Sequence, residues 1–137
     1  MTINNKKIIN VVGAVIKNER NEILCTLRNK DKDLGNYWEF PGGKIEPNET
    51  KEKAIEREIK EELDLGVKSK EILMETICER ENFIINLTCF ECDIIAGKLT
   101  LNEHEAYLWL KPESLLSLVW VPADIPIVKH LIESYKN

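Results

Sequence analysis

Three glutamates, Glu58, Glu61 and Glu62, lie close together in the segment REIKEE of residues 57–62. Residues three and four apart share one face of a helix, so a helical segment would project these carboxylates within an arc of roughly 100–140°. Mg²⁺ binds a few carboxylate oxygens in proteins and completes its shell with water and substrate phosphates. The spacing therefore indicates either a divalent-metal site for phosphate chemistry or a solvated acidic helix face.

A pair of glycines precedes this segment, in the run WEFPGGKIEP of residues 38–47. Gly42 and Gly43 would let the backbone approach a ligand closely and leave a carbonyl free to join a metal shell. Arg57 is placed to pair with a carboxylate from the intervening loop, and Glu49 is the natural partner. The loop and the glutamate-rich helix are therefore expected to act as one unit.

These residues together resemble the Nudix box, the signature of hydrolases that act on nucleoside diphosphates linked to another group. The matching positions are Gly43, Glu49, Arg57-Glu58-Ile59-Lys60-Glu61-Glu62 and the aliphatic Leu65. The match runs over 23 positions with one departure, because Asp64 stands where the family has glycine. Since Gly66 follows two residues later, we expect the helix to end slightly further along the chain.

The resemblance implies a divalent-metal site, with Mg²⁺ as the expected ion and Mn²⁺ as the alternative. The implied metal ligands are carboxylates and one backbone carbonyl: Glu58, Glu61, Glu62, Glu103 and Gly42. Glu49 and Arg57 would form a salt bridge that holds the loop on the helix. Three carboxylates remain candidates for the general base that takes a proton from the attacking water: Glu58, Glu61 and Glu103.

Outside the box, the chain resembles the MutT branch, which hydrolyses nucleoside triphosphates to monophosphate and pyrophosphate. That resemblance implies that Arg28 lies near the phosphates, that Phe40 and Gly43 line the nucleotide pocket, and that Asp124 recognises the base. Each outer position also has a structural alternative. Arg28 could be a surface charge, Glu103 a loop carboxylate, Phe40 a core residue and Asp124 the N-cap of the last helix.

The substrate expected from this resemblance is an oxidised purine triphosphate such as 8-oxo-dGTP, or a cytidine triphosphate with its 5-methyl form, in nucleotide-pool sanitation. An ionised Asp124 would only accept hydrogen bonds and would favour a donor on the base. Hydrolysis of ADP-ribose or a dinucleoside polyphosphate is the competing activity, and a non-catalytic nucleotide sensor is a third. Every metal-binding position of the box is filled, which favours an active hydrolase.

The elements that position these residues follow from hydrophobic periodicity. Ile55, Ile59 and Leu63 recur every four residues after Thr50, which predicts an amphipathic helix with Thr50 as its N-cap. Apolar β-branched runs at 8–17 and 23–28, separated by NERNE, predict a hairpin.

Further strands are predicted at 67–80, 82–95 and 105–110, and a last helix from about 122 to 135. Strands on both sides of a helix, with a terminal helix, predict an α/β fold. The Nudix resemblance specifies an α/β/α sandwich with a central mixed β-sheet in a single domain, 1–137.

A net charge of −5 argues against binding to polymeric nucleic acid but not against a nucleotide delivered with a divalent ion. No apolar run is long enough for a membrane span, and the first residues lack the pattern of a signal peptide, so a cytoplasmic protein is expected. A monomer and a homodimer are both compatible with the sequence.

The four cysteines include a Cys-x-x-Cys pair, Cys89 and Cys92, in a predicted strand. Strand residues three apart point to opposite faces, so we expect free thiols and no metal site there. His104 and His130 have no partner pattern that indicates catalysis and are expected to be structural or exposed.

Overall fold

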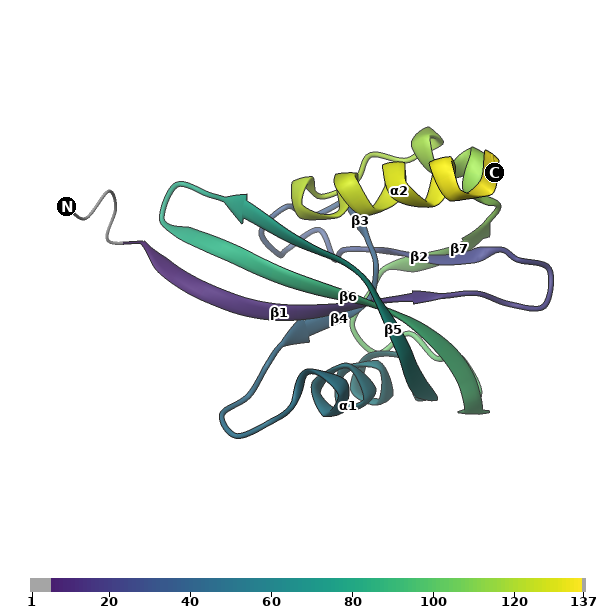
Figure 1. The fold of residues 1–137 in the computed structure, drawn as a ribbon, viewed down its shortest axis with the longest axis horizontal. Helices are drawn as coiled ribbons and strands as arrows, with labels where there is room; N and C mark the ends of the chain where they lie inside the picture. Colours follow the sequence, from purple (N-terminus) through teal and green to yellow (C-terminus); the bar gives the residue numbers. More distant parts are fainter. Residues whose placement is uncertain (1–5, 137) are drawn as a thin grey trace.

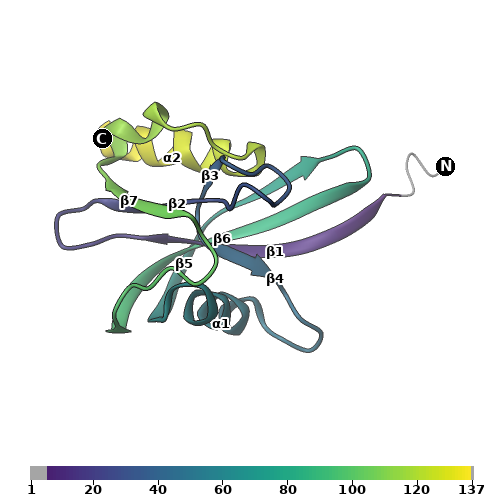
Figure 2. The same cartoon turned by 180° about the vertical axis from the view of Figure 1, so that it is seen from behind.

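Two α-helices enclose two β-sheets in the computed structural model, which describes residues 6–136 (Figure 1). The helices are α1 (Lys51–Leu63) and α2 (Ile125–Lys136), and they remain on opposite sides of the strands when the molecule is turned by 180° (Figure 2). The strands are β1 (Lys7–Ile16), β2 (Ile23–Leu27), β3 (Trp38–Glu39), β4 (Gly42–Lys44), β5 (Leu65–Glu79), β6 (Phe83–Gly97) and β7 (Ala106–Leu110). The predicted domain, 1–137, also includes residues 1–5 and 137, which lie outside the described residues.

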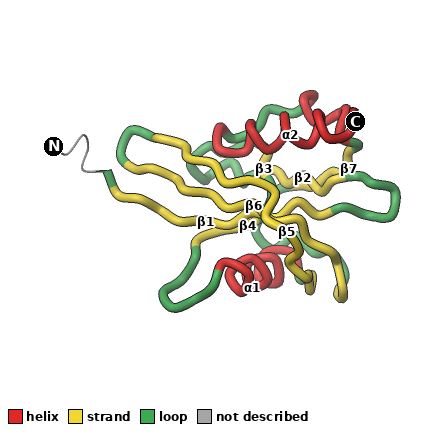
Figure 3. The backbone as a smooth tube through the Cα atoms, viewed as in Figure 1, coloured by secondary structure: helices red, strands yellow, loops and turns green. Residues whose placement is uncertain are grey.

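The larger sheet is mixed, as predicted, and has the strand order β4-β1-β6-β5. Strand β1 runs parallel to β6, whereas β4 is antiparallel to β1 and β5 is antiparallel to β6. A second, antiparallel sheet has the order β3-β2-β7 and lies on the side of α2 (Figure 3). The predicted α/β/α sandwich is confirmed, and the second sheet adds to it.

The predicted hairpin of the first two strands is wrong. Both strands form where expected, but β1 joins the mixed sheet and β2 joins the antiparallel sheet. A single antiparallel bridge, between Lys17 and Ile23, links the two segments. Strand β1 instead lies between β4 and β6, with three register pairs to β4 and ten to β6, so its neighbours in the sheet come from distant parts of the chain.

Helix α1 begins and ends through side-chain and backbone caps. The Thr50 hydroxyl accepts a hydrogen bond from the Lys53 N–H at 3.1 Å, as expected of an N-cap. The helix does not extend beyond Leu63, so the expectation of a later end is wrong. Asp64 itself takes the left-handed conformation, with φ of 59°, and its N–H bonds to the Lys60 carbonyl. Aspartate adopts the left-handed conformation more readily than most residues, so the same turn forms here without glycine.

The core has two parts, one on each side of the mixed sheet. The buried face of α1 packs against one side through Ile55 and Ile59, and α2 packs on the other side through Ile127 and Val128. Cys92 lies in the first part and its Cys-x-x-Cys partner in the second, so the two thiols point to opposite faces as predicted. All four cysteines are free.

The C-terminal element begins as a 3-10 turn, Pro122–Asp124, and continues as α2. An additional 3-10 helix, Pro112–Ser117, which was not predicted, precedes it. None of the helices between residues 6 and 136 has the length and apolar character needed to cross a membrane.

Candidate active site

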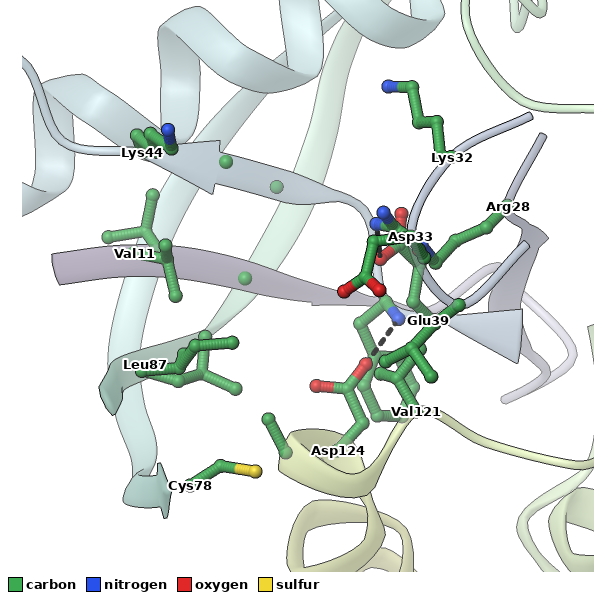
Figure 4. Close-up of a pocket in the computed structure, with 18 of the residues that line it drawn as sticks. Val11, Arg28, Lys32, Asp33, Glu39, Lys44, Cys78, Leu87, Val121 and Asp124 are labelled. Atoms are coloured by element: carbon green, nitrogen blue, oxygen red, sulfur yellow. Dashed lines mark hydrogen bonds and ion pairs between the residues drawn. The ribbon is translucent and has the colours of Figure 1, made fainter. Parts of the chain in front are cut away.

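A cavity of about 370 Å³ brings together predicted site residues that are far apart in the sequence. The size falls within the range of small-molecule sites. Its lining includes eight of the predicted residues: Arg28, Phe40, Gly42, Gly43, Glu58, Glu62, Glu103 and Asp124. Figure 4 shows Arg28 and Lys32 on one side of the cavity and Cys78 and Leu87 on the other, with Asp124 projecting from the start of the last helical segment.

Three predicted residues, Glu49, Arg57 and Glu61, do not line the cavity. Arg57 instead lies behind it and joins the loop to α1. Its guanidinium donates to both oxygens of Glu49, at 2.6 and 2.9 Å, and to the Lys44 carbonyl at 3.0 Å. The expected pair of Arg57 and Glu49 is therefore present, with the two-pronged geometry that gives strong charge-assisted hydrogen bonds.

Arg57 also contacts two of the glutamates expected to bind metal. Its Nη1 lies 3.0 Å from Glu58 and 3.3 Å from Glu61. The hydrogen bond from Arg57 lowers the pKa of Glu49 to about 2, and Glu49 and Glu58 in turn raise the pKa of Arg57. The guanidinium of Arg57 thus holds both the loop and the carboxylates of Glu58 and Glu61 in place.

Glu58 and Glu62 face the glycine pair, whereas Glu61 points outward. Glu62 is 5% exposed and accepts a hydrogen bond from the Gly42 N–H at 3.3 Å, but the Glu61 side chain is 54% exposed. A Cβ atom added at Gly43 would collide with the Glu58 carboxylate. Glycine at this position therefore allows the carboxylate to lie directly against the backbone.

The carboxylates of Glu58 and Glu62 are close enough to disfavour two negative charges. Burial, followed by the hydrogen bond and charge of Glu58, raises the pKa of Glu62 to about 10, and the charges of Glu39 and Glu103 add to the shift. A divalent cation would offset this repulsion, and the oxygen-only donor set suits a hard ion such as Mg²⁺.

No three histidine, cysteine, aspartate or glutamate side chains within residues 6–136 are grouped closely enough to form a ready-made metal cluster. Two further predicted ligands are held by cations, Glu61 by Arg57 and Glu103 by Lys32 at 3.3 Å. The residues present fit an ion with an incomplete protein shell, as is usual for Mg²⁺ bound together with substrate phosphates.

Asp124 is buried and hydrogen-bonded to another residue of the cavity lining. Its carboxylate accepts a hydrogen bond of 2.9 Å from the Phe40 N–H (Figure 4). It makes no hydrogen bond to α2 amides within residues 6–136, so the N-cap alternative is wrong. Burial raises the pKa of Asp124 to about 8, against the opposing effect of the Phe40 N–H. Burial therefore favours the neutral form of Asp124 over the ionised, acceptor-only form, and a neutral carboxyl group both donates and accepts.

Phe40 and Arg28 each combine a structural contact with a place in the cavity lining. The Phe40 ring packs against Trp120, with 4.7 Å between ring centroids, so it belongs to the core as well as to the cavity wall. Arg28 is not a free surface charge. It donates to Glu39 at 2.9 Å and to the Asp33 carbonyl at 2.8 Å.

Glu39 and His104 also line the cavity, and neither was predicted to be a site residue. The Glu39 carboxylate lies between Arg28 and His104, with 2.9 Å to the His104 Nε2. The sequence offered one signal for Glu39: in a strand it points away from the face shared by Trp38 and Phe40, so a charged side chain lies opposite two aromatic ones. His104 had none beyond its position next to Glu103, because its partner lies 65 residues away.

The apolar part of the cavity lies toward β5 and β6. Leu87 and Ile85 of β6 and Cys78 of β5 contribute to it, and Leu87 and Cys78 are visible in Figure 4. An ion pair of 3.2 Å between Arg80 and Asp33 joins two further lining residues. A flat apolar group such as a nucleobase and a charged group such as a polyphosphate would thus find different surroundings in one cavity.

Comparison with known proteins gives a consistent picture. The model of the NUDIX domain matches residues 7–131. The CTP pyrophosphohydrolase of Escherichia coli (strain K12) is 36% identical over 123 residues, which are 90% of each chain. The 8-oxo-dGTP diphosphatase of the same strain is 32% identical over 125 residues, covering 91% of this chain and 97% of that protein.

A solved structure agrees with these sequence relationships. The solution structure of the DNA mismatch repair protein MutT from methicillin-resistant Staphylococcus aureus 252 has 41% identity. It superposes with a TM-score of 0.77 over 94% of this chain and 98% of that one.

Proposed function

Because this chain belongs to the Nudix family of hydrolases, we propose that it is a metal-dependent pyrophosphohydrolase of an oxidised or modified nucleoside triphosphate. The products would be the nucleoside monophosphate and pyrophosphate. The observation that carries the proposal is the convergence of Glu58 and Glu62 on Gly42 in the same cavity as Arg28 and Asp124.

Glu58 and Glu62, together with the Gly42 carbonyl, would hold Mg²⁺, with Mn²⁺ as the alternative ion. Glu61 and Glu103 would join them when they leave Arg57 and Lys32. When bound, such an ion neutralises charge on the phosphate oxygens and lowers the pKa of a water molecule. Arg57 joins the loop to the helix and contacts Glu58, so it would help to position the carboxylates that bind the ion.

The hydrolysis follows from these positions. Glu58, Glu61 or Glu103 takes a proton from the attacking water. The water oxygen forms a bond to a phosphorus atom of the polyphosphate, the P–O bond of the anhydride breaks, and its electron pair leaves with the departing phosphate group. Arg28 would bind a phosphate oxygen through Nη2, which makes no hydrogen bond within residues 6–136.

Asp124 is the proposed base-recognising residue. A neutral carboxyl group can donate to a carbonyl such as O6 of a guanine-type base and accept from an amine such as N4 of cytosine. Both 8-oxo-dGTP and CTP, with its 5-methyl form, therefore fit this group. Relatives named for each of these substrates are about equally similar to the chain, at 32% and 36% identity. The role proposed for such an activity is nucleotide-pool sanitation, in the cytoplasm.

The test is product identification with purified protein and Mg²⁺ across 8-oxo-dGTP, dGTP, CTP, 5-methyl-dCTP, dATP and ADP-ribose. We expect pyrophosphate and a monophosphate from at least one triphosphate, with loss of turnover on chelation and recovery on adding Mg²⁺. Cleavage of ADP-ribose or a dinucleoside polyphosphate alone would contradict the proposal, as would nucleotide binding without turnover of any compound.

A further inference from the structure

His104 is a buried histidine held by one hydrogen bond. Its side chain is 5% exposed, and Nε2 lies 2.9 Å from Oε2 of Glu39. The other ring nitrogen, Nδ1, is buried and has no hydrogen-bond partner within residues 6–136. The bond to Glu39 is therefore the polar contact that sets the orientation of the ring.

Glu39 connects His104 to Arg28. One oxygen of the Glu39 carboxylate faces His104, and the other accepts a hydrogen bond of 2.9 Å from Nη1 of Arg28. All three residues line the cavity, and they come from three separate segments of the chain. We call this arrangement the Arg28–Glu39–His104 chain.

The hydrogen positions in this chain follow from its charges. A carboxylate paired with a guanidinium only accepts hydrogen bonds, so Nε2 of His104 must carry the hydrogen. Without that donor, one oxygen of the mostly buried Glu39 would be left unpaired, which is costly. The guanidinium fork of Arg28 can take both oxygens of a carboxylate, so Glu39 would turn and draw Arg28 away from its present position.

The backbone around His104 is held independently of its ring. Asn102 N–H donates to the Glu62 carbonyl at 3.0 Å, and Glu105 N–H donates to the Leu27 carbonyl at 2.9 Å. The segment is thus tied to the end of α1 on one side and to the end of β2 on the other. A change of the His104 side chain should leave this path of the backbone in place.

We infer that His104 is a positioning residue for recognition of the substrate's phosphates: through Glu39 it holds Arg28 where Nη2 is free to bind them. This inference rests on the proposed function, in which Arg28 contacts the polyphosphate. It adds to that function a residue that acts through Glu39 and Arg28 and not as a metal ligand. Its effect should appear in nucleotide affinity and KM, with kcat little changed.

A double-mutant cycle tests this coupling. The ligand is a non-hydrolysable methylene analogue of the triphosphate that the protein turns over, with Mg²⁺, measured by calorimetry. We expect His104→Ala to weaken binding about tenfold and His104→Gln, whose amide N–H can reach Glu39, to restore most of it. In an Arg28→Met background, His104→Ala should change binding less than about twofold.

His130, the other histidine, provides the matched control because it lies on α2 outside the cavity lining. His130→Ala should leave binding unchanged. An equal loss of affinity from His104→Ala in both Arg28 backgrounds would overturn the inference, and so would wild-type affinity of His104→Ala. Either result could occur with hydrolysis intact, so the proposed function would stand.

A second measurement does not depend on any variant or on nucleotide binding. The ¹⁵N NMR spectrum of the nucleotide-free protein should show the hydrogen of the His104 ring on Nε2. A neutral ring with its hydrogen on Nδ1 could not donate from Nε2 to Glu39, and this result would contradict the inference. If the wild-type protein bound none of the triphosphates, the proposed function would fail, and the phosphate role of Arg28 and His104 would fail with it.

Discussion

The carboxylate of Asp124 accepts a hydrogen bond of 2.9 Å from the backbone N–H of Phe40, although the two residues lie 84 positions apart. This contact joins the start of the C-terminal helical segment to the strand that leads into the glycine pair. Burial raises the pKa of Asp124 to about 8, which favours the neutral carboxyl group over the carboxylate. The same residue thus closes one wall of the cavity and presents a group that both donates and accepts.

Asp124→Asn should change how stability depends on pH. The pKa of Asp124 is about 8 in the folded protein and about 4 in the unfolded chain, so the folded state binds more protons between these values. This group's contribution to stability is complete below pH 4 and falls as pH rises toward 8, by at most about 1.4 kcal/mol per pH unit. Asparagine does not titrate, so the free energy of unfolding of the variant, measured in urea, should rise relative to that of the wild type between pH 5 and pH 7.5. A constant difference at the two pH values would show that Asp124 is ionised throughout.

Gly43→Ala should reduce turnover while leaving the fold intact. The added Cβ would collide with the Glu58 carboxylate, which must then move away from the glycine pair. We expect kcat/KM to fall at least about tenfold, as when a positioned catalytic group is displaced, with an unchanged far-UV circular dichroism spectrum. Gly66→Ala is the matched control, because a Cβ there meets neighbouring atoms only at ordinary contact distances. Full activity in Gly43→Ala would show that the position of Glu58 is not critical.

Glu58→Gln and Glu61→Gln should each reduce turnover at least about a hundredfold, since each removes a charged ligand or a proton acceptor. Glu52→Gln, on the exposed first turn of the same helix, should have no effect. Initial rates with Mg²⁺ on the best triphosphate provide the measurement. Near-wild-type activity in both the Glu58 and the Glu61 variant would exclude the carboxylate cluster as the catalytic centre.

Arg57→Lys should lower kcat/KM by about 10–100-fold, the usual effect of changing a group that orients metal ligands. Lysine keeps the charge but cannot bridge both oxygens of Glu49 while also contacting Glu58 and the Lys44 carbonyl. The affinity for Mn²⁺, followed by electron paramagnetic resonance, should weaken in parallel. If turnover falls but Mn²⁺ affinity does not, Arg57 acts on the substrate and not through the glutamates.

Asp64→Gly should raise the free energy of unfolding by about 0.5–1 kcal/mol. Asp64 has a φ of 59°, where a residue with a Cβ is disfavoured by roughly 1–2 kcal/mol and glycine is not. Asp64→Val should lower the free energy of unfolding, because a β-branched side chain fits this conformation poorly. Urea unfolding of the three proteins gives the comparison, and a less stable glycine variant would mean that the Asp64 side chain makes a compensating contribution.

The local features of the candidate site could be predicted from the sequence because they depend on short spacings. Glu58, Glu61 and Glu62 lie on one helix, and Arg57 reaches Glu49 across eight positions. The N-cap at Thr50 and the opposite faces of the Cys-x-x-Cys pair also follow from helix and strand periodicity. Each of these relationships is set by backbone geometry within a few residues.

The tertiary structure decided the relationships that join distant segments. The division of β1 and β2 between two sheets, the bond from Phe40 to Asp124 and the bond between His104 and Glu39 leave no periodic signal in the sequence. The raised pKa of Asp124 depends in the same way on its surroundings, because burial is a property of the packed chain. Residue types and spacings therefore indicate which groups can do chemistry, and long-range packing determines which of them meet and in which charge state.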